Sequence, residues 1–481
     1  MEQIIIGEGS YGVVAAKKNS STVNKYCHWL TDRSSVDSYL VCSTIREVCF
    51  YQYLRRANST PNSYFSHPPA SINKVHSATR NETAIALAQH HHGKRLTSLT
   101  DSDRNLENFR KIFHQILQGI HWLHSYGASH GDIKADNILV DLNFKATLID
   151  FGSACFFHHP GIVQEASRCT ITTVAPEEVL HPRWTIECDV WSIAVVMFEF
   201  LTKKIWIVEL IRQVKGEEAA SEWHRLVYKK GDTEGMEQGE KILKDLYANA
   251  TSGQINALIG RSIADRSICE ILGAALVVDK RARCTAWEML NSPVFAGVEV
   301  KFFPAWNFTG SGDAYPYDTL EIKKAPGLDR QLALQFIALM VSMPKSPFRR
   351  SWFGHACMLF DRWQFRAAAK RVLPQNLSSH AIIALAVTGA ILSHSCILMK
   401  DLATHSKTDE AVLEHEMADF FDVMGWQVWN MSPDLWCLKK WNRQPTIKIQ
   451  LKLYLKMALL TDSVDSLSEM LWTMQKETSE Q

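Results

Sequence analysis

The sequence predicts an α+β protein in which mixed strands and helices come first and an all-α bundle follows. β-branched runs flank a glycine-rich turn near the N-terminus, and a long amphipathic helix over Asn105–Tyr126 comes after them. Beyond residue 330, apolar residues recur at helical spacing almost throughout. The 481 residues leave room for two to four domains.

Composition indicates a globular protein. The chain is 46% apolar and 21% charged with a formal charge of +1, which disfavours a surface that coats nucleic acid. The 11 cysteines include no C-x-x-C pair, so we expect neither a zinc site nor a disulfide framework, and an intracellular compartment, nucleus or cytoplasm, fits. The apolar run Ala381–Leu392 is shorter than the roughly 20 residues of a membrane span, so it predicts a buried helix and no membrane association.

The first strands surround a candidate phosphate-binding turn. Ile4–Ile6 and Val13–Val14 predict strands on either side of Gly7, Gly9 and Gly12. Glycines lack a Cβ, so their backbone N–H groups can approach a phosphate closely. The G-x-G-x-x-G pattern also opens dinucleotide-binding folds, but a helix then follows, whereas β-branched residues follow here and favour a hairpin. A merely flexible hairpin is the alternative.

The next predicted strand carries Lys25, the candidate for a phosphate-pairing lysine, with Lys17 and Lys18 as competitors. A helix is predicted over Ser43–Arg56. Its Glu47 can reach back to Lys25 or, alternatively, only complement the helix dipole. The pattern then predicts a loop over Asn58–His76, a buried strand over Thr83–Ala88 and a connector at His90–His92.

The densest polar chemistry lies in residues 130–152. This segment carries two acids, Asp132 and Asp150, together with Lys134 and Asn137. These side-chain types handle a phosphate and its magnesium ions, and so many polar groups exceed what a core accommodates. The segment therefore predicts a phosphate-handling site.

These motifs, in this order, resemble a eukaryotic-type protein kinase over about residues 1–300: the glycine-rich turn, H-x-D-x-K-x-x-N at His130–Asn137, D-F-G at Asp150–Gly152, Ala175–Glu177 and Asp189–Trp191. The resemblance implies a bilobal kinase fold, with an N-terminal lobe over 1–93 and a C-terminal lobe over 94–298. It implies ATP and Mg²⁺ as cofactors and protein substrates. The alternative is a pseudokinase that keeps the fold as an interaction scaffold.

The resemblance also implies roles for single residues. The catalytic set is Asp132, Lys134 and Asn137; Asp132 orients the substrate hydroxyl, and Lys134, typical of Ser/Thr kinases, contacts the γ-phosphate. The implied magnesium ligands are Asn137 and Asp150. The implied nucleotide-binding residues are Gly7, Gly9, Gly12, Lys25 and Glu47.

Further positions match supporting residues of the family or depart from it. Thr170 matches a threonine that braces the catalytic acid, and Glu177 and Arg283 match a buried ion pair of the C-terminal lobe. Gly131 stands where kinases activated by loop phosphorylation have an arginine. Val174 stands where cyclin-dependent kinases have a substrate-pocket arginine, so the substrate sequence preference is left open.

Ser43–Glu47 resembles the signature helix of cyclin-dependent kinases. In that alignment Glu165 occupies the place of their phosphorylated threonine, and Arg46 is the one retained of three phosphate-binding arginines. We therefore predict that an Arg46–Glu165 pair orders the activation loop without phosphorylation. Thr170–Glu177, with Gly131, also resembles kinases of herpesvirus-like large DNA viruses, which leaves a viral origin open.

The last third is predicted to be helical after a linker over 299–329. The segments with apolar residues at helical spacing are Leu332–Met343, Phe353–Trp363, Ala381–Met399, Asp409–Met424 and Lys448–Leu460. Helices of this length around an entirely apolar one predict a compact bundle over 330–481.

Parts of this bundle resemble a cyclin box, namely Ala356–Trp363, Ala381–His394 and Val412–Glu416. His394 and Glu416 occupy the positions of that family's kinase-contacting pair. The two resemblances together imply an intramolecular cyclin-like partner that presses on residues 43–56 and holds Glu47 inward, at an effective concentration of roughly millimolar. An unrelated bundle, or a docking module for another partner, is the alternative.

Overall fold

The chain forms two compact units. The first comprises Met1–Phe65, Val75–Gln89 and Asn307–Gln481, and the second comprises Ser66–Lys74 and His90–Trp306. The computed structural model describes residues 3–9, 12–17, 22–28, 43–52, 68–80, 84–90, 92–156, 170–181, 185–228, 233–298, 327–370, 377–392, 397, 399–425, 446–456 and 473. The N-terminal strands thus share a unit with the C-terminal helices, and the residues from 130 to 152 lie in the other unit.

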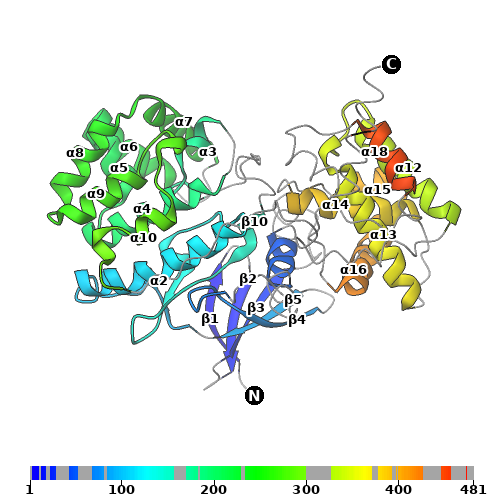
Figure 1. The fold of residues 1–481 in the computed structure, drawn as a ribbon, viewed down its shortest axis with the longest axis horizontal. Helices are drawn as coiled ribbons and strands as arrows, with labels where there is room; N and C mark the ends of the chain where they lie inside the picture. Colours follow the sequence, from blue (N-terminus) through cyan, green and yellow to red (C-terminus); the bar gives the residue numbers. More distant parts are fainter. Residues whose placement is uncertain are drawn as a thin grey trace. The chain divides into compact units, whose positions relative to one another are not determined.

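The first unit contains a five-stranded sheet in the order β1-β2-β3-β5-β4. Its strands are β1 Gln3–Gly9, β2 Gly12–Lys17, β3 Thr22–His28, β4 Val75–Arg80 and β5 Ala84–His90 (Figure 1). The pairs β1–β2, β2–β3 and β4–β5 are antiparallel. The predicted loop over Asn58–His76 is wrong at its end, because Val75 already pairs with Gln89 of β5. Cross-strand pairing, which polar strand residues do not reveal in sequence, decides this element.

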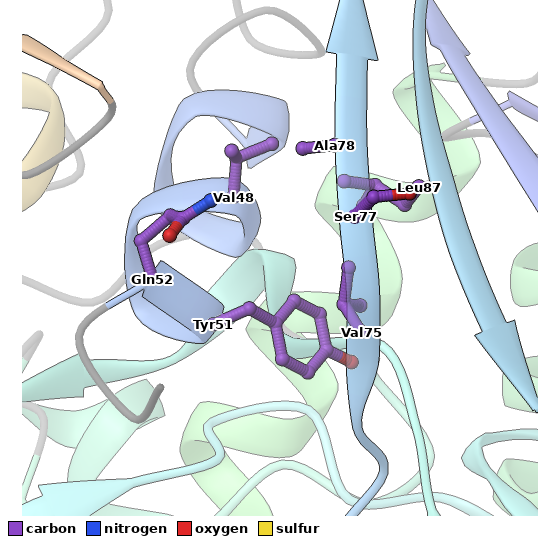
Figure 2. A pocket seen from close by; sticks show the side chains of 7 residues that line it. All are labelled: Val48, Tyr51, Gln52, Val75, Ser77, Ala78 and Leu87. Atoms are coloured by element: carbon purple, nitrogen blue, oxygen red, sulfur yellow. The ribbon is translucent and has the colours of Figure 1, made fainter. Parts of the chain in front are cut away.

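Residues 43–52 are helical, as far as the structure describes the predicted Ser43–Arg56 helix. Val48, Tyr51 and Gln52 of this helix face β4 and β5 across a small pocket, which Figure 2 shows. The side chains from the strands that line it are Val75, Ser77, Ala78 and Leu87. The helix is buried over Ser43–Tyr51, polar residues included, so it is surrounded by neighbours rather than lying on a surface.

The C-terminal part of the first unit is helical, as predicted. Its helices are α12 Gly327–Ser342, α13 Phe353–Ala369, α14 Leu377–Leu392, α15 Met399–Ser406, α16 Glu410–Met424 and α18 Ile447–Lys456 (Figure 1). α14 contacts α12, α13, α15 and α16, which accounts for its apolar sequence. The single helix predicted over Ala381–Met399 is wrong: α14 ends at Leu392, and α15 begins at Met399 with Asp401 in its first turn, where an acid favours a new helix start.

A buried ion pair ties three of these helices together. Arg330 on α12 donates to both carboxylate oxygens of Asp361 on α13, over 2.5 and 2.7 Å. The same guanidinium donates to the backbone oxygen of Tyr454 on α18 over 2.6 Å. Loss of one partner of such a pair leaves a buried charge and costs about 3–5 kcal/mol. The pair therefore fixes α18 against the bundle.

The second unit is mainly helical and carries short strands. The helices are α2 Leu106–Ser125, α3 Pro176–Leu180, α4 Glu187–Thr202, α5 Trp206–Lys215, α6 Glu217–Val227, α7 Thr233–Asn249, α8 Ser252–Ser262, α9 Arg266–Ala275 and α10 Ala286–Leu290. The strands are β6 Lys94–Arg95, β7 Ala128–Ser129, β8 Ile138–Val140, β9 Ala146–Leu148 and β10 Cys155–Phe156. α4 is buried along nearly its whole length and forms the core of this unit.

The predicted ion pair between Glu177 and Arg283 is present in this core. Arg283 donates to both carboxylate oxygens of Glu177, over 2.7 and 2.8 Å, and also to the backbone oxygen of Glu187 at the start of α4. The thiol of Cys188 donates to the same carboxylate. This network joins α3 to α4.

Among the helices that the structure describes, none has the length and apolar character of a membrane span.

Glu199 on α4 is a buried acid of this core whose pKa is strongly raised. Its Oε1 accepts a hydrogen bond from the backbone N–H of Trp206, the first residue of α5. Burial raises the pKa of this carboxyl to about 7. Because the folded state holds the proton more tightly than the unfolded state, stability falls as the pH rises from about 4.5 to about 7.

Replacing Glu199 by Gln keeps the acceptor for Trp206 and removes the charge. We expect the difference in free energy of unfolding between the variant and the natural chain to shift by about 2–3 kcal/mol in favour of the variant when the pH rises from 5 to 8. Urea denaturation at both pH values measures this shift. The exposed Glu222→Gln on α6 is the control and should show no such gain. A Glu199→Gln difference that is equal at both pH values would contradict the assignment.

Candidate active site

One buried carboxylate on α4 holds the segment that contains the candidate catalytic acid. Asp189, 1% exposed, accepts the backbone N–H of His130 over 2.8 Å and that of Gly131 over 2.9 Å. Its Oδ2 also accepts from Nε2 of His124 on α2, over 3.0 Å. Hydrogen bonds to a charged acceptor are about twice as strong as neutral ones. The segment after β7 is therefore fixed to the core of the unit.

Gly131 has a conformational reason to be glycine. Its φ is +79°, in the left-handed region, where a residue with a Cβ is strained by about 1 kcal/mol or more. In the sequence, Gly131 was notable only because kinases activated by loop phosphorylation have an arginine at this position. The structure adds that this backbone turn accompanies the paired N–H contacts with Asp189.

His130 links this segment to the Asp150–Gly152 turn. Its Nδ1 accepts the backbone N–H of Asp132 over 3.2 Å, so the ring proton lies on Nε2, which donates to the backbone oxygen of Ile149 over 2.9 Å. The ring also packs on Phe151, with centroids 4.8 Å apart. The histidine thus sets the position of the second acidic motif from within the first.

Asp132 lies at the centre of a compact polar cluster and is 7% exposed. Its Oδ1 accepts from the hydroxyl of Thr170 over 2.7 Å. Its Oδ2 accepts from Lys134 Nζ over 2.7 Å and from the Asn137 amide over 3.1 Å. Lys134 Nζ also donates to Thr170 over 3.0 Å. The four side chains that the sequence had selected thus meet at one carboxylate, which is held on both oxygens.

Asn137 and Asp150 lie at the same end of a hairpin. Strands β8 and β9 pair with Ile138 opposite Leu148, and the N–H of Ile149 donates to the backbone oxygen of Asn137 over 2.9 Å. Asn137 Nδ2 donates to both the backbone and side chain of Asp132, which leaves its Oδ1 as an acceptor. Asp150 has φ +65°, a strained value for a non-glycine residue of a kind that clusters at functional sites.

This donor set fits a magnesium ion. Mg²⁺ prefers oxygen ligands and usually takes only one or two carboxylates from the protein, with water and phosphate oxygens completing its shell. The amide oxygen of Asn137 and the carboxylate of Asp150 match that preference. Within the described ranges, no group of three His, Cys, Asp or Glu residues is placed to hold a metal on its own.

The candidate nucleotide-binding residues lie in the first unit. Lys25 on β3 donates to Glu47 Oε2 over 2.7 Å, and both side chains are buried. The three glycines lie on the β1–β2 hairpin, with Gly9 opposite Gly12. The competitor Lys17 ends β2, and Lys18 lies outside the described residues. Lys25 is thus the lysine that the structure brings to Glu47.

The other pairs predicted from the sequence include a residue with a different contact and residues outside the described ranges. Arg46 Nη1 donates to the backbone oxygen of Ala390, on the last turn of α14, over 3.2 Å. Glu165 and His394 are outside the described residues, so their pairs with Arg46 and Glu416 stay predictions. Glu416 is buried on α16, and this burial raises the pKa of its carboxyl.

Sequence reasoning missed two contributors to the site in the second unit. His124 forms a hydrogen bond with Asp189, and the backbone oxygen of Ile149 accepts a hydrogen bond from the His130 ring. A lone histidine on an amphipathic helix has no distinguishing signal, and a backbone acceptor has none at all. Only the fold brings them to the motifs.

Comparison with known proteins supports the same grouping of motifs. A model of the protein kinase domain matches residues 2–295. The chain is 27% identical over 206 residues to the putative mitogen-activated protein kinase 14C of Drosophila melanogaster, which covers 42% of this chain and 54% of the relative. It is 26% identical over 196 residues to the CBL-interacting serine/threonine-protein kinase 8 of Arabidopsis thaliana, covering 40% of this chain and 42% of the relative.

The chain spans about half the length of the curated relatives that it matches. The kinase-domain match, in contrast, takes in more than half of the 481 residues, and it contains the Asp132 cluster, the Lys25–Glu47 pair and the Glu177–Arg283 pair. Motif order, geometry and family match agree, and the chain belongs to the protein kinase family.

Proposed function

We propose that this protein transfers the γ-phosphate of ATP to serine or threonine hydroxyls of protein substrates. The observation that carries the proposal is the cluster in which Asp132 is held on both oxygens by Thr170, Lys134 and Asn137. A carboxylate fixed in this way can orient a hydroxyl and take up its proton as the new bond to phosphorus forms.

The neighbours of Asp132 divide the remaining tasks. Lys134, one quarter exposed, lies beside the carboxylate and can reach a phosphate oxygen. Asn137 and Asp150 would hold magnesium, which when bound neutralises charge on the transferring phosphoryl group. Lys25, fixed by Glu47, would hold the other phosphates of the nucleotide under the β1–β2 hairpin. The loop lysine is the feature that favours serine and threonine over tyrosine.

We also propose that the C-terminal helices control the helix over residues 43–52. Arg46 of this helix is fully buried and donates to Ala390 O near the C-terminus of α14. The last four carbonyls of a helix lack partners within it and carry partial negative charge, so a buried guanidinium is a favourable cap there. The arginine that the sequence assigned to an acid of the activation loop thus has an acceptor in the C-terminal helices.

The position of Arg46 makes this contact relevant to phosphate transfer. Arg46 is adjacent to Glu47, which pairs with Lys25, so a constraint on one residue limits rotation of the helix that carries the other. Burial of Ser43–Tyr51 on all faces is consistent with a helix confined between the sheet and other elements. This arrangement supports activation in cis by a cyclin-like domain. A scaffold without catalysis is the alternative.

Replacement of Asp132 by Asn tests the chemistry. We expect phosphate incorporation into a serine- or threonine-containing substrate such as myelin basic protein to fall at least about a hundred-fold, because the amide cannot accept the proton. The exposed Asp136→Asn, four residues on, is the matched control and should leave the rate near that of the natural chain. If the two variants retain the same activity, or the natural chain transfers no phosphate with Mg²⁺ and ATP, the scaffold reading stands.

Replacement of Arg46 by Gln tests whether the C-terminal helices control the helix over residues 43–52. The change removes a buried charged hydrogen bond, of about 1.5 kcal/mol or more, and should lower kcat/KM for ATP about ten-fold or more by loosening Glu47 from Lys25. Arg95→Gln, at a half-exposed arginine of the second unit, is the control. An Arg46→Gln chain with the same melting temperature and unchanged kinetics would refute the coupling.

A further inference from the structure

The segment Thr170–Ala175, here called the acceptor platform, joins the candidate catalytic acid to α3. Thr170 at its start contacts Asp132, and Ala175 at its end precedes Pro176, the first residue of α3. Within the platform the N–H of Thr173 donates to the backbone oxygen of Thr170 over 3.0 Å. The position of the Thr170 hydroxyl therefore depends on whatever fixes the backbone of the next four residues.

Two side chains outside the platform hold its backbone oxygens. Ser192 on α4 donates to Thr173 O over 2.8 Å. The phenol of Tyr247, near the end of α7, donates to Val174 O over 3.1 Å. Consecutive carbonyls are thus held from two different helices.

Tyr247 is built as a permanent donor. It is 2% exposed, and its ring packs edge to face on Trp191 of α4, with centroids 5.6 Å apart. Burial raises its pKa well above the ordinary value, so the phenol stays protonated at neutral pH. A phenolate could not donate to a carbonyl, so this protection preserves the contact.

α7 is itself fixed, and it passes near the platform at a second point. Trp223 on α6 donates its indole N–H to the backbone oxygen of Gly239 over 3.2 Å. A Cβ added to Gly239 would lie 2.7 Å from Val227 and 3.9 Å from the Cδ1 atom of Ile171, so glycine allows α6 and α7 to approach closely here. α7 therefore contacts the platform at Val174 and passes near it at Ile171.

We propose that α7, through Tyr247, sets the acceptor platform, and that Tyr247 is a positioning residue for the hydroxyl-bearing protein substrate rather than for ATP. The inference rests on the kinase function proposed above. Thr170 bonds Oδ1 of Asp132, whereas Asn137 and Lys134 bond Oδ2, and Asn137 and Asp150 are the candidate metal ligands. The platform thus acts on the acid through the oxygen that the other two side chains do not contact, and its one link to the phosphate-handling groups is the hydrogen bond from Lys134 Nζ to Thr170.

The effect should be selective for the acceptor. Without the phenol hydroxyl, Val174 O loses its donor in a buried place, and the platform relaxes to regain one. The Thr170 hydroxyl then no longer fixes Asp132 Oδ1, so a peptide hydroxyl is held less well. Water, which needs no platform, remains an acceptor for slow hydrolysis of ATP.

Tyr247→Phe removes the hydroxyl and retains the ring on Trp191. We expect kcat/KM for a peptide substrate to fall about five- to ten-fold, while KM for ATP and the rate of ATP hydrolysis without peptide stay within two-fold of the natural chain. Tyr228→Phe, at a half-exposed tyrosine directly after the end of α6, is the matched control and should change neither rate. Equal losses with peptide and with water, or no loss at all, would overturn the proposal.

A second readout does not require activity. Hydrogen exchange of the Thr173 amide, measured in the full chain, should accelerate in Tyr247→Phe and not in Tyr228→Phe. If the natural chain proves inactive, the proposed function fails, while accelerated exchange still shows that Tyr247 holds the platform. Unchanged exchange at Thr173 refutes the platform contact whatever the activity.

Discussion

The site depends most on the buried carboxylate of Asp189. It accepts two successive backbone N–H groups and one histidine N–H, so one side chain of α4 fixes the start of the candidate catalytic segment. From that point short contacts continue outward: His130 orients Asp132 and the turn after β9, and Asn137 bonds back to Asp132. An uncompensated buried carboxylate would be costly, so the acid and the segment stabilise each other.

The same helix supports the segment proposed to position the protein substrate. α4 supplies Ser192 to the platform, and its start is tied by Arg283 to Glu177 of α3. α7 adds Tyr247. In the other unit, Lys25 and Glu47 form a pair whose helix is connected to α14 by Arg46. The Asp132 segment is thus held by α4, and the helix that carries Glu47 is held by α14. Neither α4 nor α14 contacts substrate in the proposed mechanism.

The sequence was sufficient to predict the site residues that act through their side chains. Asp132, Lys134, Asn137 and Thr170 were selected through the resemblance to protein kinase motifs, and they meet at one carboxylate. The long helices were also predictable, because burial of one face imposes a period of 3.6 residues. α2 and α16 accordingly lie where the periodicity placed them.

The sequence was insufficient where the partner is a backbone atom or a distant strand. The acceptors of Arg46 and Tyr247 are the carbonyls of Ala390 and Val174, which carry no sequence signature. β4 was missed because its pairing with β5, rather than its own pattern, makes it a strand. Gly131 was noted for what it lacks, while its positive φ became visible only in the folded backbone.

We propose that the C-terminal helices hold the helix that carries Glu47. Removal of residues 327–481, followed by amide hydrogen exchange over residues 43–52 with α4 as the internal reference, tests this most directly. We expect faster exchange over 43–52, slow exchange retained in α4, and phosphate transfer reduced at least ten-fold. A truncated chain with unchanged protection at 43–52 and undiminished transfer would contradict it.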